Sequence, residues 1–187
     1  MTELRAPLLG LLLACLLALP ALAEEALSFS EVTITLGEDN RIFLDAQINY
    51  KLNDTATEAL ENGVPLSFVT HVQMRDVDAW VWSADVVDQR LRSILRYRPL
   101  SGLYEVRAAG SDDKQVFATR SSALRFLGRI HEMALIDRGA LDAQAEYLVR
   151  LDAYLDIEAL PLPMRPMAYL TSDWDLQAET WEWRLRP

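Results

Sequence analysis

The chain has 187 residues with 28 acidic against 18 basic side chains, which gives a formal net charge of −10 at pH 7. Nucleic-acid binding and generic attraction to anionic lipid both depend on an excess of basic side chains, so this balance argues against either. The length and the 51% content of hydrophobic residues are sufficient for one globular domain with its own core.

The amino-terminal segment has the pattern of a secretory signal peptide. Arg5 precedes an apolar run over residues 8–19, and Ala21 and Ala23 supply the small side chains that a signal peptidase requires before its cut. A membrane-spanning helix needs about 20 consecutive apolar residues, which is more than this run offers. We therefore predict cleavage after Ala23, export to the periplasm and no membrane span in the mature chain.

The mature chain then comprises residues 24–187, which we predict to form a single mainly β domain once residues 1–23 are removed. The one cysteine, Cys15, lies in the removed segment, so disulfide bonds contribute nothing to the stability of the domain. Two alternatives stay open. The segment can be retained as a membrane anchor, or a lipid can be attached to Cys15, because residues 12–15 resemble a lipobox.

The first elements of the mature chain predict a β-hairpin and a helix. Apolar and polar residues alternate over residues 30–36 and again over 42–52, with turn-forming residues at 37–40 between the two runs. A short helix is expected over residues 55–62, capped by Asn53 or Asp54 and ended by Gly63.

A third strand is expected from residue 64 to 75, and a long fourth strand from Trp80. The apolar phase of the fourth strand changes near Val87, which predicts a β-bulge or a bend at that point.

The remaining pattern predicts five more strands and one more helix. The helix is capped by Thr119 or Ser121 and ends before Gly128, and three prolines at 161, 163 and 166 favour an extended crossover. The strands are expected over residues 103–108, 115–119, 129–137, 145–156 and 181–185. The fold class that follows is mainly β, an antiparallel β-sandwich or curved sheet of about nine strands with two short helices.

No catalytic, metal or cofactor motif emerges from the sequence. The mature chain has two histidines, His71 and His131, far apart on different predicted strands, where a solvated or hydrogen-bonded structural role is expected. Serine-nucleophile motifs such as Gly-x-Ser-x-Gly are absent from the sequence. A pair of carboxylates for glycoside hydrolysis need only meet in space, so that possibility stays open without selecting particular residues.

Four arginines recur at even spacing along the predicted fourth strand of this acidic protein: Arg90, Arg92, Arg96 and Arg98. Even spacing in an extended strand directs side chains to one face. Guanidinium groups bind phosphate and carboxylate oxygens in pairs, so this row is a candidate anion-binding surface. The alternative is a solvated face whose arginines pair with acids on a neighbouring strand, such as Glu105.

The tryptophans supply a second candidate surface. Two pairs fall on the same face of their predicted strands, and they are candidates for an aromatic groove that takes a carbohydrate or a lipid. The four residues are Trp80, Trp82, Trp181 and Trp183. Core or edge packing is the alternative explanation for both pairs.

Three strings in the chain resemble an exported proteobacterial family, domain of unknown function family 4390. They are Ala59-Leu60-Glu61-Asn62-Gly63-Val64-Pro65-Leu66, Leu95-Arg96-Tyr97-Arg98-Pro99-Leu100-Ser101 and Leu160-Pro161-Leu162-Pro163-Met164-Arg165-Pro166, followed by Asp173-Trp174 and Trp181-Glu182-Trp183. The resemblance covers nearly the whole mature chain, with Met164 where leucine is expected. It implies no assigned activity, and it implies genes placed near a membrane histidine kinase.

The function expected from these observations is a non-enzymatic interaction or ligand-binding module of the cell envelope, linked to envelope signalling. Its partner would be an envelope protein, such as a membrane histidine kinase, or an anionic small ligand. The alternative is a hydrolase that acts on envelope glycan or lipid.

Overall fold

The computed structural model describes residues 26–80 and 82–187; the predicted signal peptide and Cys15 lie outside these ranges. Within the described ranges, nine strands form two antiparallel sheets. The strands are β1 (Leu27–Leu36), β2 (Arg41–Tyr50), β3 (Leu66–Asp76), β4 (Val87–Arg98), β5 (Leu103–Ala108), β6 (Lys114–Phe117), β7 (Arg129–Asp137), β8 (Tyr147–Leu155) and β9 (Trp181–Leu185). The helices are α2 (Asp54–Glu61), α3 (Arg120–Leu127) and α4 (Arg165–Leu170), with short 3-10 turns η1 (Arg138–Ala140), η2 (Ile157–Ala159) and η3 (Ser172–Trp174).

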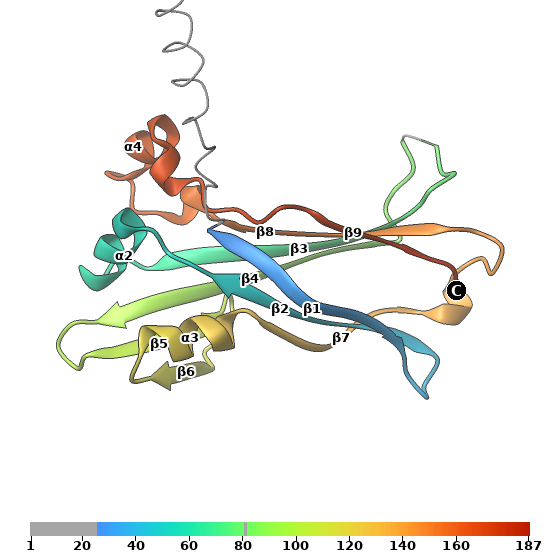
Figure 1. Ribbon diagram of the computed structural model, residues 1–187, viewed down its shortest axis with the longest axis horizontal. Helices are drawn as coiled ribbons and strands as arrows, with labels where there is room; N and C mark the ends of the chain where they lie inside the picture. The colour runs from blue at the N-terminus through green and yellow to red at the C-terminus, as the bar shows by residue number, and fades with distance from the viewer. Residues whose placement is uncertain (1–25, 81) are drawn as a thin grey trace, which may run out of the picture.

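The two sheets share one hydrophobic core. The small sheet has the order β1-β2-β7 and the large sheet the order β6-β5-β4-β3-β8-β9. Every second residue of β2, from Ile42 to Ile48, is buried, and these side chains join one apolar cluster with the inward residues of β3. The rings of Tyr50 and Phe68 meet edge to face across the layers, with centroids 4.8 Å apart. The mainly β fold predicted from the alternating pattern is confirmed. Figure 1 shows the strands of both sheets.

The predicted hairpin and the first two helices are also confirmed. β1 and β2 pair antiparallel across the turn at 37–40. The side-chain oxygen of Asn53 accepts a hydrogen bond from the Ala56 N–H at 2.9 Å, and Thr119 caps α3 in the same way. A Cβ atom at Gly128, where α3 ends, would overlap the carbonyl oxygen of Ile48, so glycine is required for α3 to lie against β2.

The long fourth strand predicted from Trp80 is wrong at its beginning. β4 starts at Val87, and residues 77–80 and 82–86 lie in a loop that projects from the sheet (Figure 1). An ion pair between Arg75 and Asp85, with nitrogen and oxygen 2.6 Å apart, closes the base of this loop. The change of apolar phase near Val87 therefore marks a bend at the start of the strand rather than a bulge, because β4 pairs with β3 without a register shift from Val87 to Leu95.

The extended crossover predicted around the three prolines is also incorrect. The chain forms α4 over Arg165–Leu170, with a proline, Pro166, in its first turn. A proline is tolerated there because the first N–H groups of a helix have no partner within the helix. Figure 1 shows α4 beyond the end of β8, so this helix borders the adjoining part of the large sheet.

Candidate functional site

The arginine row lies on the face of the large sheet that points away from the core, called here the outer face. Arg90 and Arg92 stand opposite His71 and Val69 of β3, and Arg96 stands opposite Glu105 of β5. The unbroken alternation along β4 places Arg98 on the same face. Leu95, at an intervening position, points into the core.

The four arginines differ in their partners. Arg92 pairs with Asp156 at 2.8 Å, and Arg98 pairs with Glu105 at 2.9 Å. Within the described ranges, Arg90 and Arg96 form no ion pair. The expected pairing with Glu105 is therefore made by Arg98, while the guanidinium of Arg96 stays available to another anion.

A depression on the outer face brings part of the row together with cations of the next two strands; we call it the basic hollow. Its cavity volume is about 260 Å³. It is lined by Ile94, Arg96, Arg98, Glu105, Arg107, Asp112 and Lys114. The cations outnumber the acids, so the hollow is locally positive in a protein whose net charge is −10.

Arg107 and Lys114 were not identified from the sequence. Arg107 stands opposite both Ile94 of β4 and Lys114 of β6, so the sheet register carries it to the arginine row. The signal that could have found it is the alternation in β5, where Glu105 and Arg107 share a face. Like Arg96, Arg107 forms no ion pair within the described part of the chain.

Glu105 is the internal counter-ion of the basic hollow. Its carboxylate accepts hydrogen bonds from Arg98 at 2.9 Å and from Lys114 at 3.4 Å. The bond from Arg98 is the main reason that the pKa of Glu105 lies below its usual range, and the charge of Lys114 adds to it. Near neutral pH, Glu105 is therefore ionised and pairs with two of the four cations of the basic hollow, Arg98 and Lys114.

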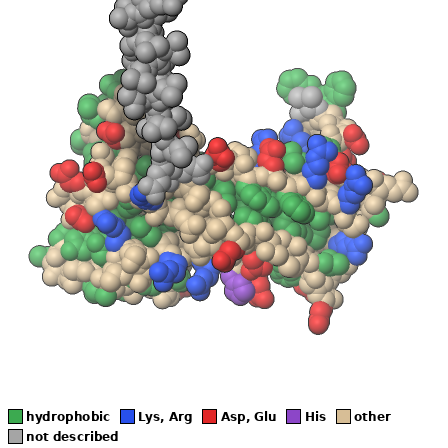
Figure 2. Space-filling model, viewed as in Figure 1, with side chains coloured by type: hydrophobic (Ala, Val, Ile, Leu, Met, Phe, Trp, Pro, Cys, Tyr) green, Lys and Arg blue, Asp and Glu red, His purple; other side chains and the backbone are tan. Residues whose placement is uncertain are grey.

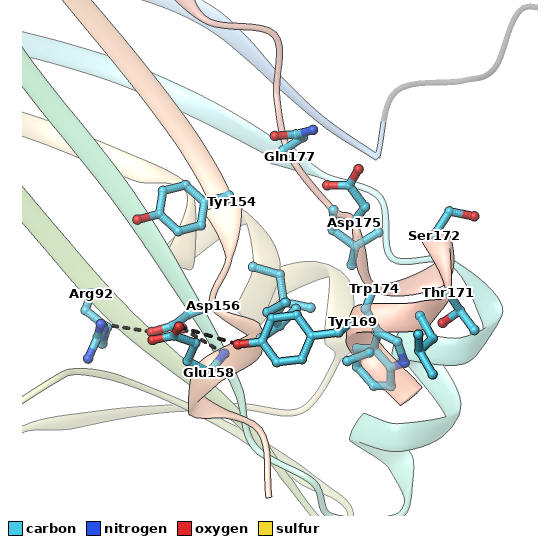
Figure 3. A pocket seen from close by; sticks show the side chains of 15 residues that line it. Arg92, Tyr154, Asp156, Glu158, Tyr169, Thr171, Ser172, Trp174, Asp175 and Gln177 are labelled. Carbon is cyan, nitrogen blue, oxygen red and sulfur yellow. Dashed lines mark hydrogen bonds and ion pairs between the residues drawn. The ribbon is translucent and has the colours of Figure 1, made fainter. Parts of the chain in front are cut away.

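A second depression adjoins the row at Arg92 and is lined in part by α4 (Figure 3); we call it the acidic hollow. Its cavity volume is about 690 Å³. Arg92 from β4 and Tyr154 from β8 form one side, and residues 155–158, 168–172 and 174–177 form the rest. The carboxylates of Asp156, Glu158 and Asp175 outnumber the single arginine, so this hollow is locally negative.

The two histidines each meet one aspartate. His71 Nε2 lies 2.6 Å from Asp88, and His131 Nδ1 lies 2.8 Å from Asp45. The pKa of Asp45 is lowered, mainly because the Glu132 N–H donates a hydrogen bond to it and secondly because His131 does so. Hydrogen-bonded structural roles therefore fit both histidines, and the described residues contain no group of three metal-ligating side chains.

The structure does not bring the two tryptophan pairs together. Trp80 and Trp82 lie in the projecting loop, 73% and 85% exposed, and Figure 2 shows apolar side chains at the tip of this loop. Trp181 and Trp183 stack on β9 with ring centroids 6.1 Å apart. Because β9 pairs only with β8 in the large sheet, and no ring contact between the pairs occurs within the described ranges, a shared groove does not follow from this geometry.

The model of one protein family matches residues 24–184, and its description is a domain of unknown function, DUF4390. No curated protein gives a significant match to the chain, and no solved structure does so. Within the described ranges, the helices are too short or too polar for any of them to cross a membrane.

Proposed function

This chain belongs to the DUF4390 family, and we propose that it is an exported, non-enzymatic anion-binding module of the cell envelope. Its ligand is a small anion, or the anionic group of an envelope partner, held in the basic hollow. The pattern of residues 1–23 supports export to the periplasm, where such ligands are available. The resemblance to proteins encoded near a membrane histidine kinase supports a role in envelope signalling.

The observation that carries the proposal is the gathering of Arg96, Arg98, Arg107 and Lys114 in one hollow. Guanidinium groups hold phosphate or carboxylate oxygens through paired, charge-assisted hydrogen bonds. Two of the four cations, Arg96 and Arg107, form no ion pair with any residue that the structure describes, so an incoming anion displaces no described carboxylate from them. The volume of about 260 Å³ lies below the roughly 300–1,000 Å³ of small-molecule pockets, which suits one anionic group better than a large ligand.

Titration calorimetry with inorganic phosphate tests this proposal on the exported protein. Arg96→Ser combined with Arg107→Ser should weaken binding at least a hundredfold, because each charge-assisted hydrogen bond contributes about 1.5–3 kcal/mol. Arg129→Ser is the matched control, since Arg129 is an exposed arginine of β7 in the other sheet. No binding by the wild-type chain, or equal losses in both variants, would contradict the proposal.

Export has its own test. The protein recovered from the periplasmic fraction should begin at Glu24 when its amino terminus is sequenced. A protein that keeps Met1 and sediments with membranes would show the retained anchor instead, and a lipid on Cys15 would show the lipoprotein.

A hydrolase of envelope glycan or lipid is the second candidate function, and the acidic hollow is the observation that favours it. Glycosidases use two carboxylates about 5–10 Å apart, and Glu158 and Asp175 line the same hollow. Incubation with purified peptidoglycan or phospholipid should then release soluble products, and Glu158→Gln should abolish the release. Absence of products from wild-type protein would eliminate this candidate.

A further inference from the structure

The acidic hollow has the size and the lining of a ligand site that is chemically distinct from the basic hollow. Its volume of about 690 Å³ falls within the range of small-molecule pockets. The excess of carboxylates repels anions, so the ligand class proposed for the basic hollow does not fit here. The occupant inferred below does not depend on the anion-binding function proposed for the basic hollow; it shares its site with the hydrolase candidate but requires no catalysis.

Aromatic rings enter the acidic hollow from two separate elements. Tyr154 comes from β8 and Tyr169 from α4, while the side chain of Trp174 is buried in the wall behind them. Tyr169 is 59% exposed, and its hydroxyl donates a hydrogen bond to Glu158 at 3.4 Å. This bond holds an exposed aromatic face toward the hollow, as Figure 3 shows.

The polar groups of the hollow include both donors and acceptors. Asp156 is fully engaged, because it pairs with Arg92 at 2.8 Å and accepts a hydrogen bond from the Glu158 N–H at 3.1 Å. The side chains of Asp175 and Gln177 are exposed, and within the described residues they make no hydrogen bond or ion pair. Figure 3 places these two across the view from Asp156 and Glu158, so polar groups face the hollow from different sides.

We propose that the acidic hollow binds a saccharide unit. A pyranose ring has an apolar C–H face that packs on an aromatic ring, and a rim of hydroxyls that both donate and accept hydrogen bonds. Tyr169 supplies the ring, and the free oxygens and amide of Asp175 and Gln177 bond to the rim. A polyamine would share the aromatic and carboxylate contacts, but its protonated amines only donate hydrogen bonds and offer no acceptor to the amide N–H groups of Gln177.

Saturation-transfer NMR on the exported protein tests the proposal with chitotriose and maltotriose as probes and spermidine as the counter-probe. We expect saturation transfer to the ring protons of at least one trisaccharide and none to spermidine. No transfer to either trisaccharide, or binding of spermidine in their place, overturns the proposal.

Variants connect the binding to the named side chains. Tyr169→Ala and Asp175→Asn should each weaken trisaccharide binding about tenfold, the loss of one good contact. Tyr169→Phe keeps the ring and loses only the bond to Glu158, so it should lose less affinity than Tyr169→Ala, which protects the test against a folding defect in Tyr169→Ala. Asp113→Asn, an exposed aspartate outside both hollows, is the control for Asp175→Asn. Equal losses in Asp113→Asn and Asp175→Asn would also overturn the proposal.

Phosphate binding, measured on the same samples, distinguishes the anion-binding proposal from the saccharide proposal. Asp175→Asn should retain the phosphate affinity of the wild type, because Asp175 lies outside the basic hollow. Failure of phosphate binding in the wild-type chain counts against the anion-binding function, and failure of trisaccharide binding counts against the saccharide site while it leaves the anion-binding function untouched.

Discussion

The basic and acidic hollows occupy one sheet face and share the arginine row, yet their local charges are opposite. At the basic end, β5 and β6 add Arg107 and Lys114 to Arg96 and Arg98. At the acidic end, the turn after β8 adds Asp156 and Glu158, and Asp156 neutralises Arg92. The comparison teaches that a row of like charges on one strand does not set the chemistry of a site; the neighbouring strands and turns do.

The two hollows are far enough apart to act separately. Arg92 and Arg96 are four residues apart on β4, and a strand rises about 3.3 Å per residue, so their backbones are about 13 Å apart. The Debye length at physiological ionic strength is about 8 Å, so exposed charges at this separation are largely screened from each other. Each hollow can therefore be altered without a large effect on the other.

The largest expected effect comes from Trp174→Ala, which removes a buried wall of the acidic hollow. Trp174 is 5% exposed, and truncation of a buried aromatic side chain costs about 3–5 kcal/mol of unfolding free energy. Urea denaturation should show this loss, and trisaccharide binding should disappear while phosphate binding remains in the folded protein. Trp183→Ala is the control, since Trp183 is 54% exposed and should cost much less. Similar costs for the two variants would show that Trp174 is not a supporting residue.

The next effect should be a gain of anion affinity in Glu105→Gln. Removal of this carboxylate frees Arg98 and Lys114 for the ligand, so sulfate should bind about tenfold more tightly in calorimetry. Trisaccharide binding at the acidic hollow should not change. Weaker sulfate binding would mean that Glu105 positions the cations rather than competing for them.

A smaller effect should appear in the pH dependence of the wild-type chain. The pKa of Glu105 is lowered in the folded protein, so its pairs with Arg98 and Lys114 stabilise the fold fully above about pH 4.3, the ordinary value for glutamate, and that contribution is lost as the pH falls through the lowered pKa. Protonation also frees the two cations, so sulfate affinity should rise over the same interval. In Glu105→Gln this rise should be smaller; an equal rise would assign it to other groups.

The smallest effect is expected from Trp80→Ser combined with Trp82→Ser in the projecting loop. Both side chains are mostly exposed and line neither hollow, so stability should change by about 0.5 kcal/mol or less, and phosphate and trisaccharide affinities should stay the same. A loss of trisaccharide binding would restore the aromatic groove as the saccharide site.

Local patterns predicted the elements that depend on neighbouring residues. The hairpin of β1 and β2, the cap at Asn53 and the shared face of the arginine row all follow from spacing within one segment. Trp80 was assigned to a strand because alternation continues through residues 80–86, but the pair between Arg75 and Asp85 closes that segment into a loop. α4 was missed because a proline at the start of a helix has the same local signature as an extended crossover.

The sequence by itself determined that the chain folds into a mainly β domain, that its amino terminus has the pattern of an export signal, and that four arginines share one strand face. These properties depend on composition and on residues close together in the chain. Only the tertiary structure decided which of those arginines are neutralised, because Asp156 and Glu105 reach them through strand pairing and a turn. It also decided that Tyr154, Tyr169 and Gln177 line one hollow, since separate elements carry them there.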